Sequence, residues 1–158
     1  MAKQIYSYPD LSNSIVLVTG ANGGIGFDIV NSALQAGAKV LATDLVIGAS
    51  LEKLNSNERF ISKAYDLQDD SQCNECIAWS NSLGVNVLVN NAAIFDMAPF
   101  LESSLDQYDQ LFSVNVRAMF AMMQGIAKGL DSRKEKGSII NFSSQAGRRG
   151  EALVSHYC

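Results

Sequence analysis

Three glycines near the start of the chain have a spacing that could bind a phosphate group. They are Gly20, Gly24 and Gly26, within the segment Thr19-Gly-Ala-Asn-Gly-Gly-Ile-Gly26. An apolar, strand-like run precedes them and a helical pattern follows, so the glycines occupy a strand-to-helix turn. Glycine lets the backbone approach a pyrophosphate closely, and the free N–H groups at a helix start can bind it. A glycine-rich turn without a ligand is the alternative.

Two carboxylates follow at the ends of the next predicted strands. Asp44 lies 24 positions after Gly20, where it could accept hydrogen bonds from both ribose hydroxyls of an adenosine. It would repel a 2′-phosphate, and neither the next residue, Leu45, nor the glycine turn supplies a basic group. The pattern therefore favours NAD over NADP, unless Asp44 only caps a turn. Asp66 could bind an adenine amino group or cap the turn that follows it.

Alternating strand and helix patterns place these residues in an α/β fold. The strands are largely apolar, which is typical of a parallel sheet covered on both faces, and right-handed crossovers make it a doubly wound, Rossmann-type sheet. No linker or repeat divides residues 1–158, so we expect a single domain. The predicted strands are 15–19, 39–44, 60–66, 85–90 and 138–142, and the predicted helices are 27–36, 47–54, 70–83 and 105–130.

Small or polar residues stand at the carboxyl ends of all five predicted strands. Ligands of such sheets bind outside these ends. A sheet without a ligand gives no reason for this coincidence, so the sequence predicts a site at that edge. The residues are Gly20, Asp44, Asp66, Asn90-Asn91 and Ser143-Ser144.

Composition excludes several other classes of protein. The 158 residues are 47% hydrophobic and 18% charged, which is unlike a disordered chain. A net charge of -4 argues against a nucleic-acid partner. No apolar run approaches the ~18 residues of a membrane span, and residues 1–14 lack the apolar centre of a signal peptide. We therefore expect a cytoplasmic protein with neither a nucleic-acid nor a membrane partner.

Two further features carry weaker signals. Cys73 and Cys76 form C-x-x-C within a predicted helix, but His156 is the only histidine, so we expect ordinary thiols and no metal. Asn115 falls on the apolar stripe of the long helix, where a polar group needs partners. Neighbouring backbone could satisfy it, or it could mark a helix distortion that holds a water near the site.

Taken together, these motifs resemble the short-chain dehydrogenase/reductase family. The matching residues are Thr19-Gly20-x-x-x-Gly24-x-Gly26, Asp66-Leu67, Asn90-Asn91-Ala92-Ala93, Asn115, and Ser144 thirteen residues before Tyr157. Ala93 stands where the family usually has glycine. The resemblance implies NAD contacts at Gly20, Asn22, Gly24, Ile25, Gly26, Asp44, Asp66, Leu67, Asn91 and Ala92, and catalytic roles for Asn115, Ser144 and Tyr157.

The resemblance also implies a mechanism. Tyr157 would be the general base, Ser144 would hold the substrate oxygen, and Asn115 would hold a water in the proton relay. The family places a lysine four positions after the tyrosine, which here is beyond Cys158. We therefore expect a C-terminally truncated chain that lacks the family's last helices and strands. We also expect a frayed Tyr157, and little or no activity from these 158 residues alone.

Within the family, residues 91–99 and 144–154 are similar to the bacterial sorbitol (L-iditol) dehydrogenases, which oxidise polyols to ketoses with NAD. We expect Ser144, Gln145 and Glu151 to bind polyol hydroxyls, with a surface loop as the alternative, and Phe95 and Met97 to line the substrate pocket. The resemblance also implies a homodimer or homotetramer. Another short-chain reductase, acting on 3-oxoacyl or sugar substrates, and a non-catalytic NAD-binding module remain alternatives.

Overall fold

A five-stranded parallel sheet forms the centre of the molecule. The computed structural model describes residues 9–158. The strands lie in the order β3-β2-β1-β4-β5, and every neighbouring pair is parallel. This order reverses between β1 and β4, and such a reversal opens a crevice at the carboxyl ends of the two strands. The strands are β1 (Ile15–Thr19), β2 (Lys39–Asp44), β3 (Phe60–Ala64), β4 (Val87–Asn90) and β5 (Ser138–Asn141).

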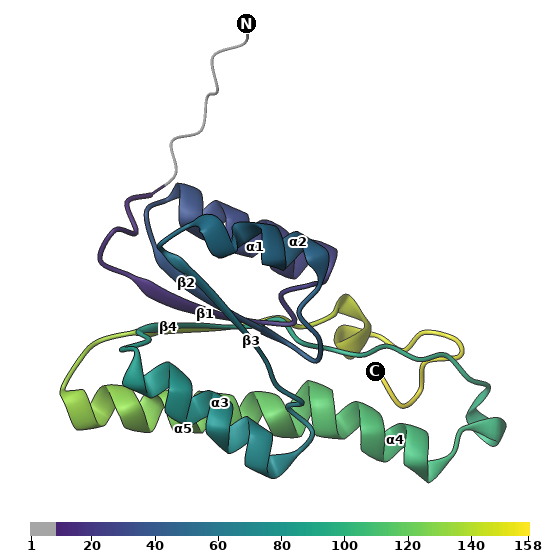
Figure 1. The fold of residues 1–158 in the computed structure, drawn as a ribbon. Helices are drawn as coiled ribbons and strands as arrows, with labels where there is room; N and C mark the ends of the chain where they lie inside the picture. Colours follow the sequence, from purple (N-terminus) through teal and green to yellow (C-terminus); the bar gives the residue numbers. More distant parts are fainter. Residues whose placement is uncertain (1–8) are drawn as a thin grey trace, which may run out of the picture.

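Helices cover both faces of this sheet. Helices α1 (Gly24–Gln35) and α2 (Ala49–Glu52) lie on one face. On the other face, α3 (Asp70–Ser82) and α5 (Met119–Arg133) run side by side, and α4 (Leu105–Phe112) extends from the start of α5 beyond the sheet (Figure 1). Within residues 9–158, no helix is both long enough and apolar enough to cross a membrane.

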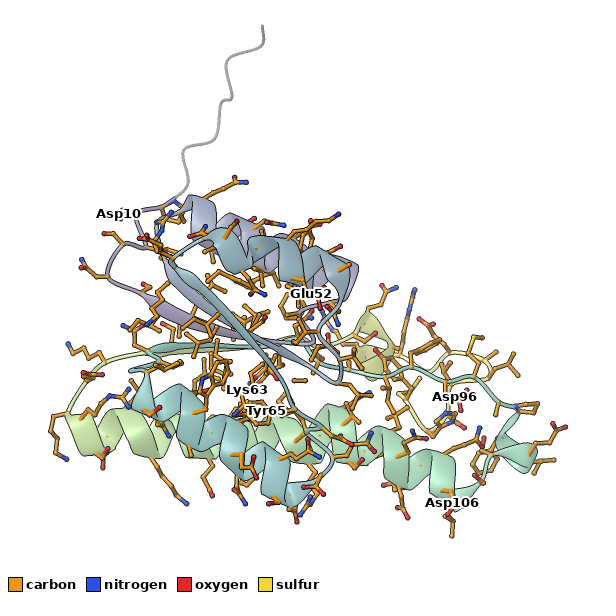
Figure 2. All side chains as sticks on the ribbon, in the orientation of Figure 1. Asp10, Glu52, Lys63, Tyr65, Asp96 and Asp106 are labelled. Carbon is orange, nitrogen blue, oxygen red and sulfur yellow. The ribbon has the colours of Figure 1, made fainter. Side chains whose placement is uncertain are left out.

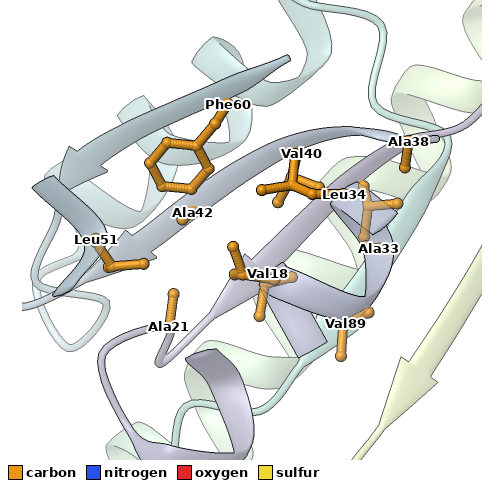
Figure 3. Close-up of a cluster of buried hydrophobic side chains, with 12 residues drawn as sticks. Val18, Ala21, Ala33, Leu34, Ala38, Val40, Ala42, Leu51, Phe60 and Val89 are labelled. Atoms are coloured by element: carbon orange, nitrogen blue, oxygen red, sulfur yellow. The ribbon is translucent and has the colours of Figure 1, made fainter. Parts of the chain in front are cut away.

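Alternating strand residues build one core on each face. Val18, Val40 and Ala42 point toward α1, where they pack with Leu34 (Figure 3). The intervening Leu17 and Leu41 point to the other face and pack with residues of α3 and α5. Because both faces are covered by helices, the central strands read as continuous apolar runs in the sequence.

The core beneath β3 includes aromatic residues with polar ends. Tyr65 is buried and its ring lies 5.9 Å from that of Trp79. Lys63 places its ammonium 4.8 Å from the centre of the Tyr65 ring, and Figure 2 shows the two side chains together below the sheet. The aromatic pair thus fills the space between β3 and α3.

The fold confirms the predicted α/β class and the five strands, with differences at the ends of elements. Helix α1 begins at Gly24 rather than at residue 27. The sequence predicted a later start because glycine has a low helix propensity, and the first turn of α1 contains Gly24 and Gly26. The short helix predicted at 47–54 is α2 followed by a 3₁₀ turn, Lys53–Ser56. The long helix predicted at 105–130 contains a π-helical segment, Ser113–Ala118, between α4 and α5.

The central strand offers a direct test of this core. Leu17 is fully buried, so Leu17→Ala should lower the free energy of unfolding by about 2–5 kcal/mol through lost burial and a residual cavity. The control is Leu101→Ala, because Leu101 is 94% exposed and its truncation should change stability by less than about 0.5 kcal/mol. Urea unfolding of the two variants measures the difference. Equal effects would contradict the described packing.

Candidate functional site

Hydrogen bonds tie the carboxyl ends of β1 and β4 together where the strand order reverses. The Thr19 hydroxyl accepts from the backbone N–H groups of Asn91 and Ala92, at 3.1 and 3.0 Å. In return, the Asn91 side-chain amide donates to the carbonyl oxygens of Thr19 and Gly20, at 3.2 and 2.9 Å. The segment after β4 is thereby fixed beside the glycine turn.

Two of the three motif glycines are required by this packing. Gly20 has φ +63°, and a Cβ built on it would lie 2.7 Å from the Ala92 Cα. A Cβ on Gly26 would lie 2.1 Å from the Gly20 carbonyl oxygen. Gly24 differs, because a Cβ there would meet no atom within 4 Å. Protein packing gives no reason for a glycine at position 24, whereas a ligand approaching the backbone would.

A pocket of about 620 Å³ lies against this turn. Its volume is within the range of ligand sites. All ten residues predicted to contact the cofactor line it: Gly20, Asn22, Gly24, Ile25, Gly26, Asp44, Asp66, Leu67, Asn91 and Ala92. The structure thus brings together residues from the ends of β1, β2, β3 and β4.

Two carboxylates and no cation line this pocket. The Asp44 carboxylate accepts hydrogen bonds from the backbone N–H groups of Asn22 and Leu45, both at 2.8 Å. Asp66 accepts from the Gln68 N–H at 2.9 Å, as a turn cap would. Each carboxylate oxygen has further acceptor capacity, so these bonds leave room for a ligand. Among the described residues, no Lys, Arg or His lines the pocket.

Asn115 lies in the π-helical segment between α4 and α5. Its side-chain amide donates to the Ile94 carbonyl oxygen and accepts from the Ile94 N–H, both at 2.8 Å. The structure therefore shows both a backbone partner and a distorted helix, which the sequence left as alternatives. These two bonds join the helix layer to the loop after β4.

A second pocket, of about 540 Å³, contains the three predicted catalytic residues. Asn115, Ser144 and Tyr157 all line it. It shares a wall with the first pocket, formed by Ile25, Asn91, Ala92 and Ala93. The Ser144 hydroxyl caps a 3₁₀ turn, Gln145–Arg148, by accepting from the Ala146 N–H at 3.1 Å, and its own proton remains available for donation.

Tyr157 was predicted to be frayed, but in the structure its ring has an aromatic partner. Its ring packs edge-on against Phe95, with centroids 4.9 Å apart and planes at 88°. The Ala98 N–H also donates to the Leu153 carbonyl oxygen at 2.9 Å. These contacts hold the last residues beside the loop after β4, as the yellow and teal segments of Figure 1 show. The prediction of a frayed tyrosine was wrong because it ignored this aromatic partner.

Four residues predicted near the substrate line neither pocket. Gln145 and Glu151 are exposed, as are Phe95 and Met97. Phe95 instead supports Tyr157 from outside the second pocket. Of the three predicted polyol contacts, Ser144 alone lines one of these two pockets of residues 9–158.

The C-x-x-C motif lies away from both pockets. Cys73 and Cys76 are free, buried thiols of α3 within the core beneath the sheet. Burial raises the pKa of Cys73, and it raises the pKa of Cys76 to about 12, so both stay protonated at neutral pH. No group of three potential His, Cys, Asp or Glu ligands occurs anywhere in residues 9–158.

The family model described as short chain dehydrogenase matches residues 14–158. The chain belongs to this family. The chain is 36% identical over 154 residues to a sorbitol dehydrogenase of Cereibacter sphaeroides, covering 94% of the chain and 59% of that protein. It is 39% identical over 149 residues to the L-xylulose reductase of Bos taurus, covering 94% and 60%. The chain thus spans 59–60% of the length of these curated relatives.

Solved structures support the same assignment. A short-chain dehydrogenase from Brucella melitensis, described as a glucose/ribitol dehydrogenase, superposes with a TM-score of 0.85 at 27% identity, covering 96% of this chain and 65% of that one. A 4-hydroxyisoleucine dehydrogenase complexed with NADH superposes with a TM-score of 0.85 at 25% identity, covering 92% of this chain and 60% of that one. A serine dehydrogenase complexed with NADP+ superposes with a TM-score of 0.79 at 29% identity, covering 90% of this chain and 59% of that one. Structural neighbours of this chain therefore include one complexed with NADH and one complexed with NADP+.

Sequence reasoning missed several residues of this site. Thr19 was quoted only as part of the motif, yet its hydroxyl joins β1 to the segment after β4. Tyr65 and Gln68 line the first pocket beside Asp66. The position of Tyr65 directly before Asp66 at a strand end could have indicated this. No sequence signal indicated the contact between Phe95 and Tyr157.

The glycines of the turn provide a matched pair of variants. Gly24→Ala should leave the free energy of unfolding within about 1 kcal/mol of the parent value, because the added methyl group meets no protein atom and alanine favours a helix. It should weaken the binding of a nicotinamide dinucleotide about tenfold or more by obstructing the backbone approach. Fluorescence titration and urea unfolding measure the two effects.

The control, Gly26→Ala, should behave differently. Its methyl group would overlap the Gly20 carbonyl oxygen, so we expect a loss of stability together with the loss of binding. Unimpaired dinucleotide binding by Gly24→Ala would contradict the assignment of the open space to a ligand.

Proposed function

We propose that this protein is an NAD-dependent dehydrogenase that oxidises a secondary alcohol of a polyol to a ketose. The observation that carries the proposal is the pair of adjoining pockets. One holds two carboxylates against a glycine turn, and the other holds Asn115, Ser144 and Tyr157. Relatives named as sorbitol dehydrogenase and galactitol 2-dehydrogenase support a polyol substrate.

The preference for NAD rests on charge. Asp44 would accept hydrogen bonds from the ribose hydroxyls, and a 2′-phosphate at the same place would meet its negative charge. Among the described residues, no basic side chain lines this pocket to offset that repulsion. Asp66 would receive the adenine amino group with the acceptor capacity left beside its bond from Gln68.

The second pocket would carry the proton transfer. NAD, when bound, would accept the hydride. Tyr157 would take the alcohol proton, and Ser144 would donate a hydrogen bond to the substrate oxygen. A free phenol has a pKa of about 10, so the tyrosine needs a nearby positive charge to act as a base at neutral pH. The family lysine, expected at the third position after Cys158, would supply it.

Asn115 would act by position. Its amide oxygen and one amide proton are bonded to the backbone of Ile94. One amide proton remains for a water in the proposed relay. The π-helical segment around it would direct that residue into the second pocket.

Reduction of a sugar is the second candidate function. The L-xylulose reductases of several mammals are 37–39% identical to this chain. Such an activity would use the same residues in the reverse direction. The acidic first pocket favours the NAD-linked oxidation.

A small-molecule polyol or ketose is the proposed partner, and a homodimer or homotetramer is the proposed assembly. Apolar residues at i, i+4 spacing are exposed along α4, the π-helical segment and α5, which would suit a helix-to-helix interface. They are Tyr108, Phe112, Val116 and Phe120, and the rings of Tyr108 and Phe112 stack at 4.2 Å.

Removing the charge of Asp44 tests the cofactor preference. Asp44→Asn should weaken NADH binding about tenfold and strengthen NADPH binding, because it removes one ribose acceptor and the repulsion of the 2′-phosphate. Titration of the chain with both dinucleotides measures this shift. Asp28→Asn is the control, since it changes the net charge equally from an exposed site outside this pocket. A preference that does not move with Asp44→Asn would overturn the NAD assignment.

A substrate panel tests the reaction. We expect the protein that contains this chain to form NADH from sorbitol or galactitol, and to do so faster than it forms NADPH from NADP. Removal of the Ser144 hydroxyl by Ser144→Ala should lower kcat at least about a hundredfold, as the loss of one oxyanion donor does elsewhere. Rapid NADPH-dependent reduction of a ketose without polyol oxidation would favour the second candidate instead.

A further inference from the structure

Asn22 joins the glycine turn to the loop that follows β2. Its side-chain oxygen accepts from the Gly48 N–H at 3.0 Å, and its side-chain nitrogen donates to the Val46 carbonyl oxygen. Its backbone N–H donates to the Asp44 carboxylate at 2.8 Å. One residue thus holds both ends of the segment 44–48.

These bonds commit most of the Asn22 side chain to protein backbone. One amide proton is left, so the side chain has little capacity to bind a cofactor directly. The fit is close, because a Cβ on Gly48 would lie 3.0 Å from the Asn22 side-chain oxygen. Asn22 lines the first pocket, but its contacts point to a positioning role.

Asp44 is anchored as the last residue of β2, where its carbonyl oxygen accepts from the Tyr65 N–H at 3.0 Å, but the two residues after it are largely exposed. Leu45 and Val46 are 62% and 65% exposed, so core packing contributes little to their position. Ile47 alone packs partly against the core beneath α1. The Asp44 carboxylate is fixed at its two ends by the N–H groups of Asn22 and Leu45. Both donors are backbone groups, so the Asn22 side chain acts on the place of this charge through the position of Leu45 and the residues that follow it.

We propose that Asn22 is a positioning residue that sets the preference between NAD and NADP by holding the segment 44–48 against the glycine turn. This inference rests on the proposed function, since it assigns a role to a residue beside the same pocket. A carboxylate discriminates against a 2′-phosphate only while its charge stays at the ribose, because the repulsion falls with distance and with solvent screening. Loss of the two Asn22 side-chain bonds would free the segment that carries the Leu45 N–H, and the carboxylate would then lose one of its two fixed donors.

The test is the ratio of two dissociation constants in Asn22→Ala. We expect NADH binding to weaken about tenfold, as the loss of two modest hydrogen bonds implies, while NADPH binding weakens by less than about twofold. The ratio of the NADPH Kd to the NADH Kd should then fall at least about fivefold, which is the tenfold change for NADH divided by the twofold change for NADPH. If Asn22 had only a general structural role, its loss would weaken the binding of NADH and NADPH by the same factor. An unchanged Kd ratio therefore overturns the proposal.

Gly48→Ala supplies a second, independent variant. Its methyl group should displace the Asn22 side chain and lower the same ratio severalfold in the parent chain. In the Asn22→Ala background there is no Asn22 amide for the new methyl group to displace. Gly48→Ala should therefore leave the Kd ratio of NADPH to NADH unchanged in that background. An equal effect of Gly48→Ala in both backgrounds contradicts the proposal. Urea unfolding confirms that each variant is folded, and Asn22 is exposed, so stability should change little.

Failure of this inference differs from failure of the proposed function. If the parent chain binds neither dinucleotide, the proposed function fails and the inference fails with it. If the parent binds NADH and Asp44→Asn shifts the preference while Asn22→Ala leaves it unchanged, only the role of Asn22 is overturned.

Discussion

The contact between Gly20 and Ala92 is the constraint on which the site depends. A side chain at position 20 would displace the Ala92 Cα, and a second close approach, between Gly26 and the Gly20 carbonyl oxygen, excludes a side chain at position 26. Thr19 and Asn91 hold the first of these approaches with four hydrogen bonds. The Gly20–Ala92 contact places the segment after β4 and the wall between the two pockets, and the Gly26–Gly20 contact places the helix start.

Much of this arrangement could be predicted from the sequence because it follows from local chemistry. Buried parallel strands require apolar runs, and the runs at β1, β2 and β4 marked those strands within one or two residues at each end. Parallel strands also bring their carboxyl ends to one edge, so Asp44, Asp66 and Asn91 were expected together. The prediction succeeded where a residue's neighbours follow from its place in a strand.

The rest depends on contacts that no local pattern encodes. The π-helical segment around Asn115 arises where a helix must present an amide to Ile94, which is 21 positions earlier in the chain. Tyr157 is positioned by Phe95, and Asn22 by Gly48. In each case a polar or aromatic side chain meets backbone or a ring from a distant loop. Periodicity cannot report such pairs, because it describes only the neighbours along one element.

The shared wall gives the proposed cofactor a direction. The first pocket ends in the carboxylates of β2 and β3, and the second contains Ser144 and Tyr157. A dinucleotide with its ribose at Asp44 and its pyrophosphate over Gly24 would reach the second pocket past the shared wall, which includes Ile25 and Ala92. The nicotinamide would then lie beside the proposed base. Asn22 and Asn115 are alike in one respect, because the side-chain amide of each donates to and accepts from the backbone of a distant loop.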